Sequence, residues 1–166
     1  MAHHLGRYSC RSVIILGQRI DVLKDFFEND LPTDHKFFLE VRHPEWFSDA
    51  TGRRLLFDLL AKHQVGSTIS DASGRRDCLH MELPTPELFI RFIGNGGINK
   101  DSDRERIDRW IDRISNLVNQ GLENVYFFVH QHEEEDTPVL ASYAINQFNQ
   151  RLGAGLREIK LIAPAL

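Results

Sequence analysis

The chain has 166 residues, 42% hydrophobic and 27% charged, a composition typical of a globular protein with one sizeable core. Its formal net charge of -4 at pH 7 argues against a nucleic-acid-binding protein, because such proteins usually carry a basic stripe. No apolar run is long enough to span a membrane, and two cysteines (Cys10 and Cys78) are too few for a disulfide framework, so we expect a reduced, cytoplasmic protein.

Residues 1–17 are the hardest part of the chain to interpret. Their one apolar run, Val13–Leu16, is compatible with a short strand. Apolar residues then recur at helical spacing from Ile20 to Phe27. The sequence Asn29-Asp30-Leu31-Pro32 is expected to end this helix.

A buried strand is predicted at Phe37–Arg42, because this run is as apolar on both faces as a central parallel strand. Glu40 and Arg42 lie two residues apart and therefore share one face of the strand. Burying a carboxylate and a guanidinium is costly unless they pair with each other or with a bound ligand. His43 and Pro44 end the strand at its C-terminal end, where parallel α/β folds keep their sites.

A helix over about residues 50–63 and a second strand at Val65–Asp71 are predicted next. The expected buried stripe of the helix is Leu55, Leu56, Leu59 and Leu60. Residues 72–87 show no helical period and are expected to form a long loop, which in a compact domain is often functional.

The rest of the chain repeats the pattern of a strand followed by a helix. Leu88–Ile93 is predicted as the third strand, and the glycine-rich residues 94–97 after it lack the motifs of nucleotide-binding loops. A long helix over residues 101–120 precedes a fourth strand at Asn124–His130. The expected core stripe of that helix is Ile107, Trp110, Ile111, Ile114, Leu117 and Val118.

A final helix is predicted to begin with Thr137 as its N-cap and Pro138 in its first turn. Gly153 is expected to close it. The residues beyond form a weakly structured tail, with one short strand expected at Ile159–Ile162.

Strands that alternate with helices predict βαβ units, and therefore a parallel sheet with right-handed crossovers and outer helices. Four such units are visible, which is half of an eight-fold barrel. The predicted fold class is therefore α/β, and the predicted architecture is a partial TIM-type barrel.

Four sequence blocks coincide with the four predicted strands: Leu39–Phe47, Ile69–Gly74, Phe89–Asn95 and Val125–Gln131. In this order they resemble the motifs "VE-x-RH-x-SW", "ADT", "YVRLHG" and "VYVYFNN" of the YecE-like family, also called domain of unknown function seventy-two. The resemblance covers about residues 20–153 in both order and spacing.

Members of that family have a TIM-barrel fold and no established activity, so the resemblance implies the last four units of such a barrel. The opening strands of the family have no counterpart here, which implies a truncated barrel. Two positions depart from the family pattern: Ile93 stands where the family often has histidine, and His130 lies near its asparagine pair. We divide the chain into a divergent segment 1–19, a half-barrel domain 20–153 and a tail 154–166.

Charged and polar side chains are expected to converge at the C-terminal mouth of the strands: Glu40, Arg42, Asp71, Arg91 and His130. One interpretation is a structural ion-pair lattice, in which Glu40 pairs with Arg42 or Arg91 and backbone amides bond Asp71. Another is an anion site, in which both arginines hold a carboxylate or a phosphate. The candidate acids and bases of that site are Glu40, Asp71 and His43, and its binding candidates are Arg42, Arg91, Asn95, His130 and Trp46.

A metal site is the third interpretation, since the side chains of Glu40, His43, Asp71 and His130 are of types that bind metals in barrel-fold isomerases and endonucleases. No metal-binding spacing supports it, and the nearby arginines disfavour a cation. We assign no metal and no cofactor.

The sequence thus predicts acid/base chemistry on a small polar or anionic substrate at the ends of the barrel strands. The competing hypothesis is a non-catalytic remnant or interaction module. A half barrel exposes two strand edges, which can pair with a partner or a second copy of the chain as a homodimer.

Overall fold

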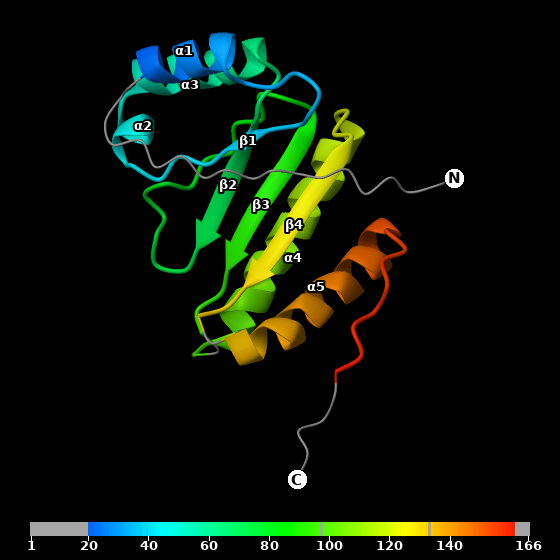
Figure 1. Ribbon diagram of the computed structural model, residues 1–166. Coiled ribbons are helices and arrows are strands. Elements are labelled where there is room, and N and C mark those ends of the chain that lie inside the picture. Colours follow the sequence, from blue (N-terminus) through cyan, green and yellow to red (C-terminus); the bar gives the residue numbers. More distant parts are fainter. Residues whose placement is uncertain (1–19, 97, 133, 162–166) are drawn as a thin grey trace.

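The computed structural model describes residues 20–96, 98–132 and 134–161, which form one parallel sheet with helices packed against it (Figure 1). The strands are β1 (Phe38–Leu39), β2 (Gly66–Ala72), β3 (Glu87–Ile93) and β4 (Asn124–His130). The helices are α1 (Ile20–Asn29), α2 (Glu45–Ser48), α3 (Ala50–Lys62), α4 (Lys100–Asn119) and α5 (Thr137–Leu152), with a short 3-10 helix η1 (Glu134–Asp136). The predicted α/β class is confirmed.

The strands lie in the order β1-β2-β3-β4, and every neighbouring pair is parallel. Helices α3 and α4 form two of the crossovers, while the predicted long loop connects β2 to β3. The register places Ser70 of β2 opposite Arg91 of β3, and Arg91 opposite Phe128 of β4. Because all strands run the same way, their C-terminal ends share one edge of the sheet.

β1 is shorter than the predicted strand Phe37–Arg42 and comprises only two residues. The reason lies in the loop that follows β2. The Cys78 thiol of this loop donates a hydrogen bond to the carbonyl oxygen of Arg42 at 2.7 Å. The loop, rather than β2, therefore holds the backbone of the segment that ends with Arg42.

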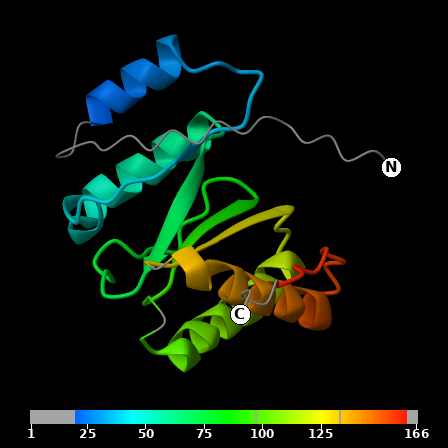
Figure 2. The ribbon, with the colours of Figure 1, turned by 60° about the horizontal axis from the view of Figure 1, so that its bottom comes forward.

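Helices α4 and α5 cover one face of the sheet, and Figure 1 shows α4 running behind β3 and β4. The larger core cluster buries Ile107, Ile111 and Ile114 of α4 with Ile90 and Phe92 of β3. A second cluster joins α1 and α3 to the β1 side of the sheet, and Figure 2 shows these two helices apart from α4 and α5. No helix among the described residues is long and apolar enough to cross a membrane.

The buried side of α3 differs from the predicted leucine stripe. Leu56, Phe57 and Leu60 are buried, whereas Leu55 is 50% exposed. The helix is turned so that Phe57 packs its ring against the buried ring of His80, with centroids 5.1 Å apart. For α4 the prediction is confirmed at Ile107, Trp110, Ile111 and Ile114, but Val118 is 52% exposed.

Helix α5 begins one residue earlier than its predicted cap implies, because Asp136 occupies the N-cap position and Thr137 is the first helical residue. The Thr137 hydroxyl instead accepts a hydrogen bond from the backbone N–H of Gln131 at 3.2 Å. Gly153 closes the helix in the left-handed conformation, as predicted.

Two short strands were predicted near the ends of the chain, at Val13–Leu16 and Ile159–Ile162. Residues 159–161 form no strand, and Ile162 lies outside the described residues. The expected strand at Val13–Leu16 also lies outside them.

Candidate functional site

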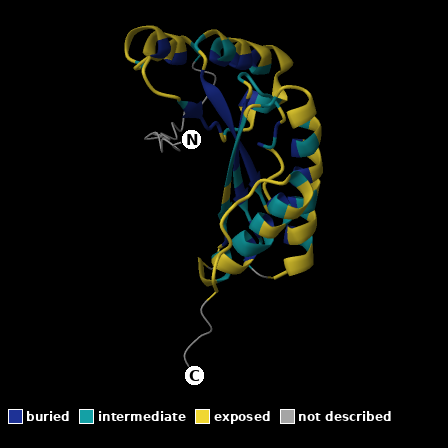
Figure 3. Cartoon of the chain, turned by 90° about the vertical axis from the view of Figure 1, so that its right-hand side faces the viewer, coloured by how far each residue is buried: buried dark blue, intermediate teal, exposed yellow. Residues whose placement is uncertain are grey.

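The sheet has two chemically different faces, because successive side chains of a strand point to opposite sides. Leu88, Ile90 and Phe92 of β3 pack in the core under α4. Phe89 and Arg91 therefore point to the opposite face, which we call the site face. Figure 3 shows that the helices α4 and α5 lie on one side of the sheet only.

An ion cluster lies on the site face near the C-terminal ends of the strands. The carboxylate of Glu40, 3% exposed, accepts a hydrogen bond from Arg42 Nε at 2.8 Å and from Arg91 Nη1 at 3.3 Å. The hydroxyl of Ser70 on the intervening strand also bonds this carboxylate. Two guanidinium groups thus share one carboxylate, so the three described side chains of Glu40, Arg42 and Arg91 together carry a net positive charge. The prediction that Glu40 and Arg91 meet on one face is confirmed.

A pocket of about 370 Å³ adjoins this cluster. Its lining residues come from β2, β3, β4 and the residue after β1: Glu40, Thr68, Phe89, Arg91, Phe128, Val129 and His130. The buried hydroxyl oxygen of Thr68 has no hydrogen-bond partner among the described residues. A buried polar atom without a partner costs free energy, so this hydroxyl is available to a bound ligand.

Aromatic side chains line the site face next to the ion cluster, toward the N-terminal ends of the strands. The rings of Phe89 and Phe128 stack with centroids 4.9 Å apart and an interplanar angle of 13°. Phe38 contacts Phe89 and Tyr126 at centroid distances of 5.0 and 5.4 Å. Phe89 is 7% exposed, whereas Phe128 is 55% exposed. The pocket is therefore charged toward the strand ends and aromatic toward the middle of the sheet.

Asp71 does not join the other predicted site residues. Its carboxylate lies under α4 and accepts hydrogen bonds from Arg106 Nη2 and Trp110 Nε1, each at 2.7 Å, and from Arg76 Nη1 at 2.5 Å. The pleat of β2 explains this difference, because Ser70 faces Glu40 and the next residue must face the helices. The expected backbone donors of the Asp71 carboxylate are thus replaced by side chains.

The predicted residues Asn95, His43 and Trp46 also lie outside the pocket lining. Asn95 belongs to the loop before α4, where its side-chain amide donates to the carbonyl oxygen of Asn99 at 2.8 Å. His43 Nδ1 lies 3.6 Å from Glu45 Oε2. Trp46 is fully buried in the core cluster of α1 and α3. Of the predicted residues, Glu40, Arg91 and His130 line the pocket, and Arg42 lies outside the lining but joins the ion cluster through Glu40. The neutral residues Thr68, Ser70 and Phe128 were not predicted.

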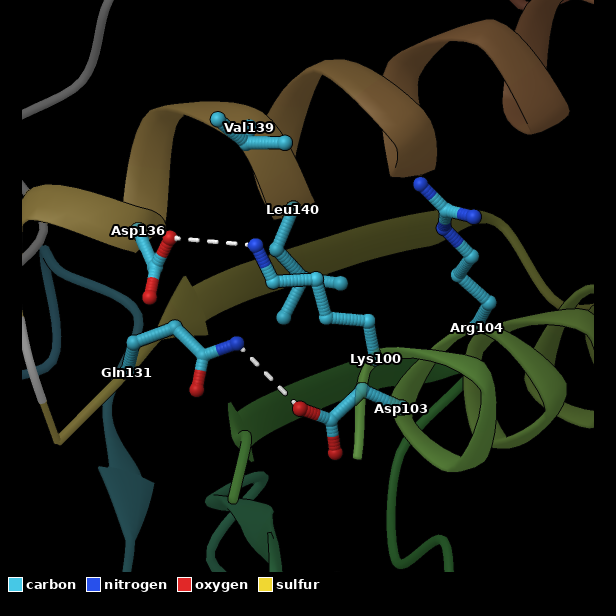
Figure 4. A pocket seen from close by; sticks show the side chains of 7 residues that line it. All are labelled: Lys100, Asp103, Arg104, Gln131, Asp136, Val139 and Leu140. Carbon is cyan, nitrogen blue, oxygen red and sulfur yellow. Dashed lines mark hydrogen bonds and ion pairs between the residues drawn. The ribbon is translucent and has the colours of Figure 1, made fainter. Parts of the chain in front are cut away.

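A second polar cluster lies on the helix side of the strand ends and involves Asp103, which is fully buried. Asp103 accepts a hydrogen bond from Gln131 Nε2 at 3.2 Å (Figure 4). It also accepts one from the backbone N–H of Asn95 at 3.0 Å. The cavity beside it measures about 20 Å³, enough for about one water molecule. This cavity is too small for a substrate, and its lining residues are Lys100, Asp103, Arg104, Gln131, Asp136, Val139 and Leu140.

His80 is a buried histidine in the loop between β2 and β3. Its ring stacks on Phe47 with centroids 5.3 Å apart, and its Nε2 lies 3.3 Å from the carbonyl oxygen of Thr68. Burial, with a smaller effect from the positive charge of Arg53, lowers the pKa of His80 to about 4. His80 therefore stays neutral in the folded protein and fastens the loop to the sheet.

The metal interpretation finds no geometric basis in the part of the chain that the structure describes. Asp71 lies on the opposite face of the sheet from Glu40. Within residues 20–96, 98–132 and 134–161, no group of three histidine, cysteine, aspartate or glutamate side chains could hold a metal ion.

Comparison with known proteins identifies the family. Residues 15–161 match the model of the family described as "Protein of unknown function DUF72". The chain belongs to the DUF72 family. The resemblance seen in the strand blocks is thereby confirmed. A comparison with curated proteins gives no match.

Solved structures of DUF72 family proteins have a similar fold. One from Enterococcus faecalis V583 superposes with a TM-score of 0.63 at 14% sequence identity, covering 90% of this chain and 62% of that chain. One from Thermotoga maritima MSB8 gives a TM-score of 0.58 at 14% identity, covering 89% and 58%. This chain thus spans less than two thirds of the length of these DUF72 proteins. At this identity the similarity concerns the fold and not the activity.

Proposed function

We propose that the pocket on the site face binds a small anionic ligand, a carboxylate or a phosphate. The observation that carries this proposal is the sharing of one carboxylate, that of Glu40, between the guanidinium groups of Arg42 and Arg91. The excess positive charge favours an anion, and guanidinium groups bind carboxylates and phosphates through paired hydrogen bonds. The side chain of Arg91 is only about one-third exposed, so a ligand that reaches it is partly removed from water. Its attraction to the guanidinium is then screened less than at the protein surface.

Proton transfer at this site falls to the residues that line the pocket. Of the predicted acids and bases, Glu40 lines it, whereas Asp71 and His43 do not. His130 lines the pocket as well, and an imidazole can donate or accept a proton. If the bound ligand reacts, we therefore assign the acid/base step to Glu40 and His130.

We also infer that the sheet corresponds to the second half of a TIM-type barrel. Four parallel strands in sequential order, with helices on one face, support this inference. The partial coverage of longer DUF72 structures supports it too. In such barrels the active site lies at the C-terminal ends of the strands, where the ion cluster is found.

Titration with inorganic phosphate and with acetate tests the anion site by isothermal calorimetry. We expect Arg91→Ala to weaken binding of both anions at least tenfold, and Arg42→Ala to weaken it as well. The matched control is Arg109→Ala, since Arg109 is a surface arginine paired with Glu105 on α4. Phosphate and acetate affinities that stay unchanged in both Arg91→Ala and Arg42→Ala would refute the proposal.

The second candidate function is pairing with another copy of this chain through β4. Among the described residues β4 pairs with β3 alone, and an apolar groove of about 460 Å³ runs beside it under α5. Two copies of β4 related by a two-fold axis would pair antiparallel and contact each other through the same residues.

Analytical ultracentrifugation of Val118→Glu tests this pairing, because Val118 lines the groove and is 52% exposed. We expect the wild type to dimerise and the variant to sediment as a monomer with an unchanged melting temperature. A monomeric wild type at 100 µM, roughly a hundredfold above a micromolar dissociation constant, would rule the dimer out.

A further inference from the structure

We propose that the ligand carries a planar apolar ring next to its anionic group, and that this ring stacks on Phe128. The inference rests on the proposed anion site, which it extends by naming the class of ligand: an aromatic carboxylate or an aromatic phosphate ester.

The register of the sheet places the two required groups side by side. Arg91 and Phe128 are direct partners in the pairing of β3 with β4. Both line the same pocket on the site face. Neighbouring strands lie roughly 5 Å apart, so one small ligand can contact both side chains.

The exposure of Phe128 suits it to stacking. Its ring packs against Phe89, which is buried, yet Phe128 itself remains 55% exposed. A ligand ring placed on Phe128 would continue the stack in the offset geometry that aromatic rings prefer. The stacked pair also fixes the orientation of Phe128, so that little conformational freedom is lost on binding.

The size and polarity of the pocket agree with a ligand larger than a bare anion. Its volume of about 370 Å³ lies in the range of small-molecule sites, about 300–1,000 Å³. The buried hydroxyl of Thr68, without a partner in the described part of the chain, can bond a polar substituent of the ligand. An isolated phosphate would leave the aromatic wall of the pocket unused.

Two pairs of probes with matched anionic groups test the inference: phenyl phosphate against inorganic phosphate, and benzoate against acetate. We expect each aromatic probe to bind wild-type protein at least tenfold more tightly than its partner. Phe128→Leu keeps an apolar side chain of similar size without the ring, so it should bring both ratios close to one. A melting temperature equal to that of the wild type shows that the variant is folded.

The outcomes separate the two proposals. If phosphate binds through Arg91 but both ratios in the wild type are close to one, the ring inference fails and the anion site stands. Tighter binding of the aromatic probes that persists in Phe128→Leu also overturns the ring inference. If no anion binds, or binding does not depend on Arg91 and Arg42, the anion site fails and the ring inference fails with it.

Discussion

The carboxylate of Glu40 lies 3.3 Å from the guanidinium of Arg91, although 51 residues separate them in the sequence. These residues belong to segments that do not pair directly, since β2 lies between β1 and β3. The hydroxyl of Ser70 on β2 donates a hydrogen bond to the same carboxylate. The ion cluster therefore forms only when three successive segments of the sheet have come together.

Replacing Glu40 by glutamine is expected to destabilise the fold and to strengthen anion binding. The variant weakens hydrogen bonds of a buried carboxylate, a loss of about 1–3 kcal/mol in the free energy of unfolding, and frees two guanidinium groups for an anion. Urea denaturation and phosphate titration measure the two effects. Glu82→Gln is the control, because Glu82 pairs with Arg53 at the surface and should cost less than about 1 kcal/mol. Equal losses in the two variants would contradict the prediction.

Trp110→Phe is expected to cost about 1–3 kcal/mol more than Trp46→Phe, because only the first change removes a buried hydrogen bond. Trp110 Nε1 donates to the Asp71 carboxylate at 2.7 Å. Trp46 Nε1 is buried without a partner among the described residues. Both changes remove the same atoms, so the difference between the two urea midpoints isolates the hydrogen bond. The prediction fails if Trp46→Phe is the more destabilised variant.

Protonation of His80 is expected to weaken the fold as the pH falls. The folded protein holds the pKa of His80 at about 4, below its ordinary value of 6.5, because burial disfavours the charged ring. The unfolded chain therefore binds the proton first. The contribution of the neutral His80 ring to the free energy of unfolding is complete above pH 6.5. It is lost as the pH falls toward 4, by about 3 kcal/mol in total. Urea unfolding at pH 8, 6 and 4.5 should show this loss in the wild type, and a clearly smaller loss in His80→Gln. Parallel pH profiles would disprove the role of His80.

Gly94→Ala is expected to destabilise the protein by about 1–3 kcal/mol, the usual cost of overpacking. A Cβ at this position would overlap the side-chain oxygen of Gln131 and lie 2.6 Å from Asp103 Oδ2. Gln131→Ala removes the first obstacle, so the double variant should lose less than the sum of the two single losses. Thermal melting of the four proteins gives the coupling, and strict additivity would show that the two residues do not collide.

The order of the strands and helices could be predicted from the sequence, because long apolar runs indicate buried strands and apolar residues at helical spacing indicate packed helices. β4 was predicted at its exact bounds, Asn124–His130. The pairing of Glu40 with Arg42 followed from their spacing within one segment. These features depend on local periodicity, which a single sequence contains.

What could not be predicted depends on contacts between segments. Asp71 lies near the end of a strand, as Glu40 does, but the pleat of β2 turns its side chain toward α4. Phe57 is buried in place of Leu55 because the loop brings His80 against it. The alternation of Thr68 and Ser70 with Ile69 was the one signal that could have revealed the polar side of β2.

The composition of β4 has a consequence for how the protein behaves while it folds. Its seven residues include no proline, lysine or arginine, the residues that usually guard such strands against other chains. A partly folded molecule that exposes this strand can template cross-β stacking with its neighbours. Heterologous production is therefore expected to give inclusion bodies at high synthesis rates, and slower synthesis at low temperature should recover more native protein.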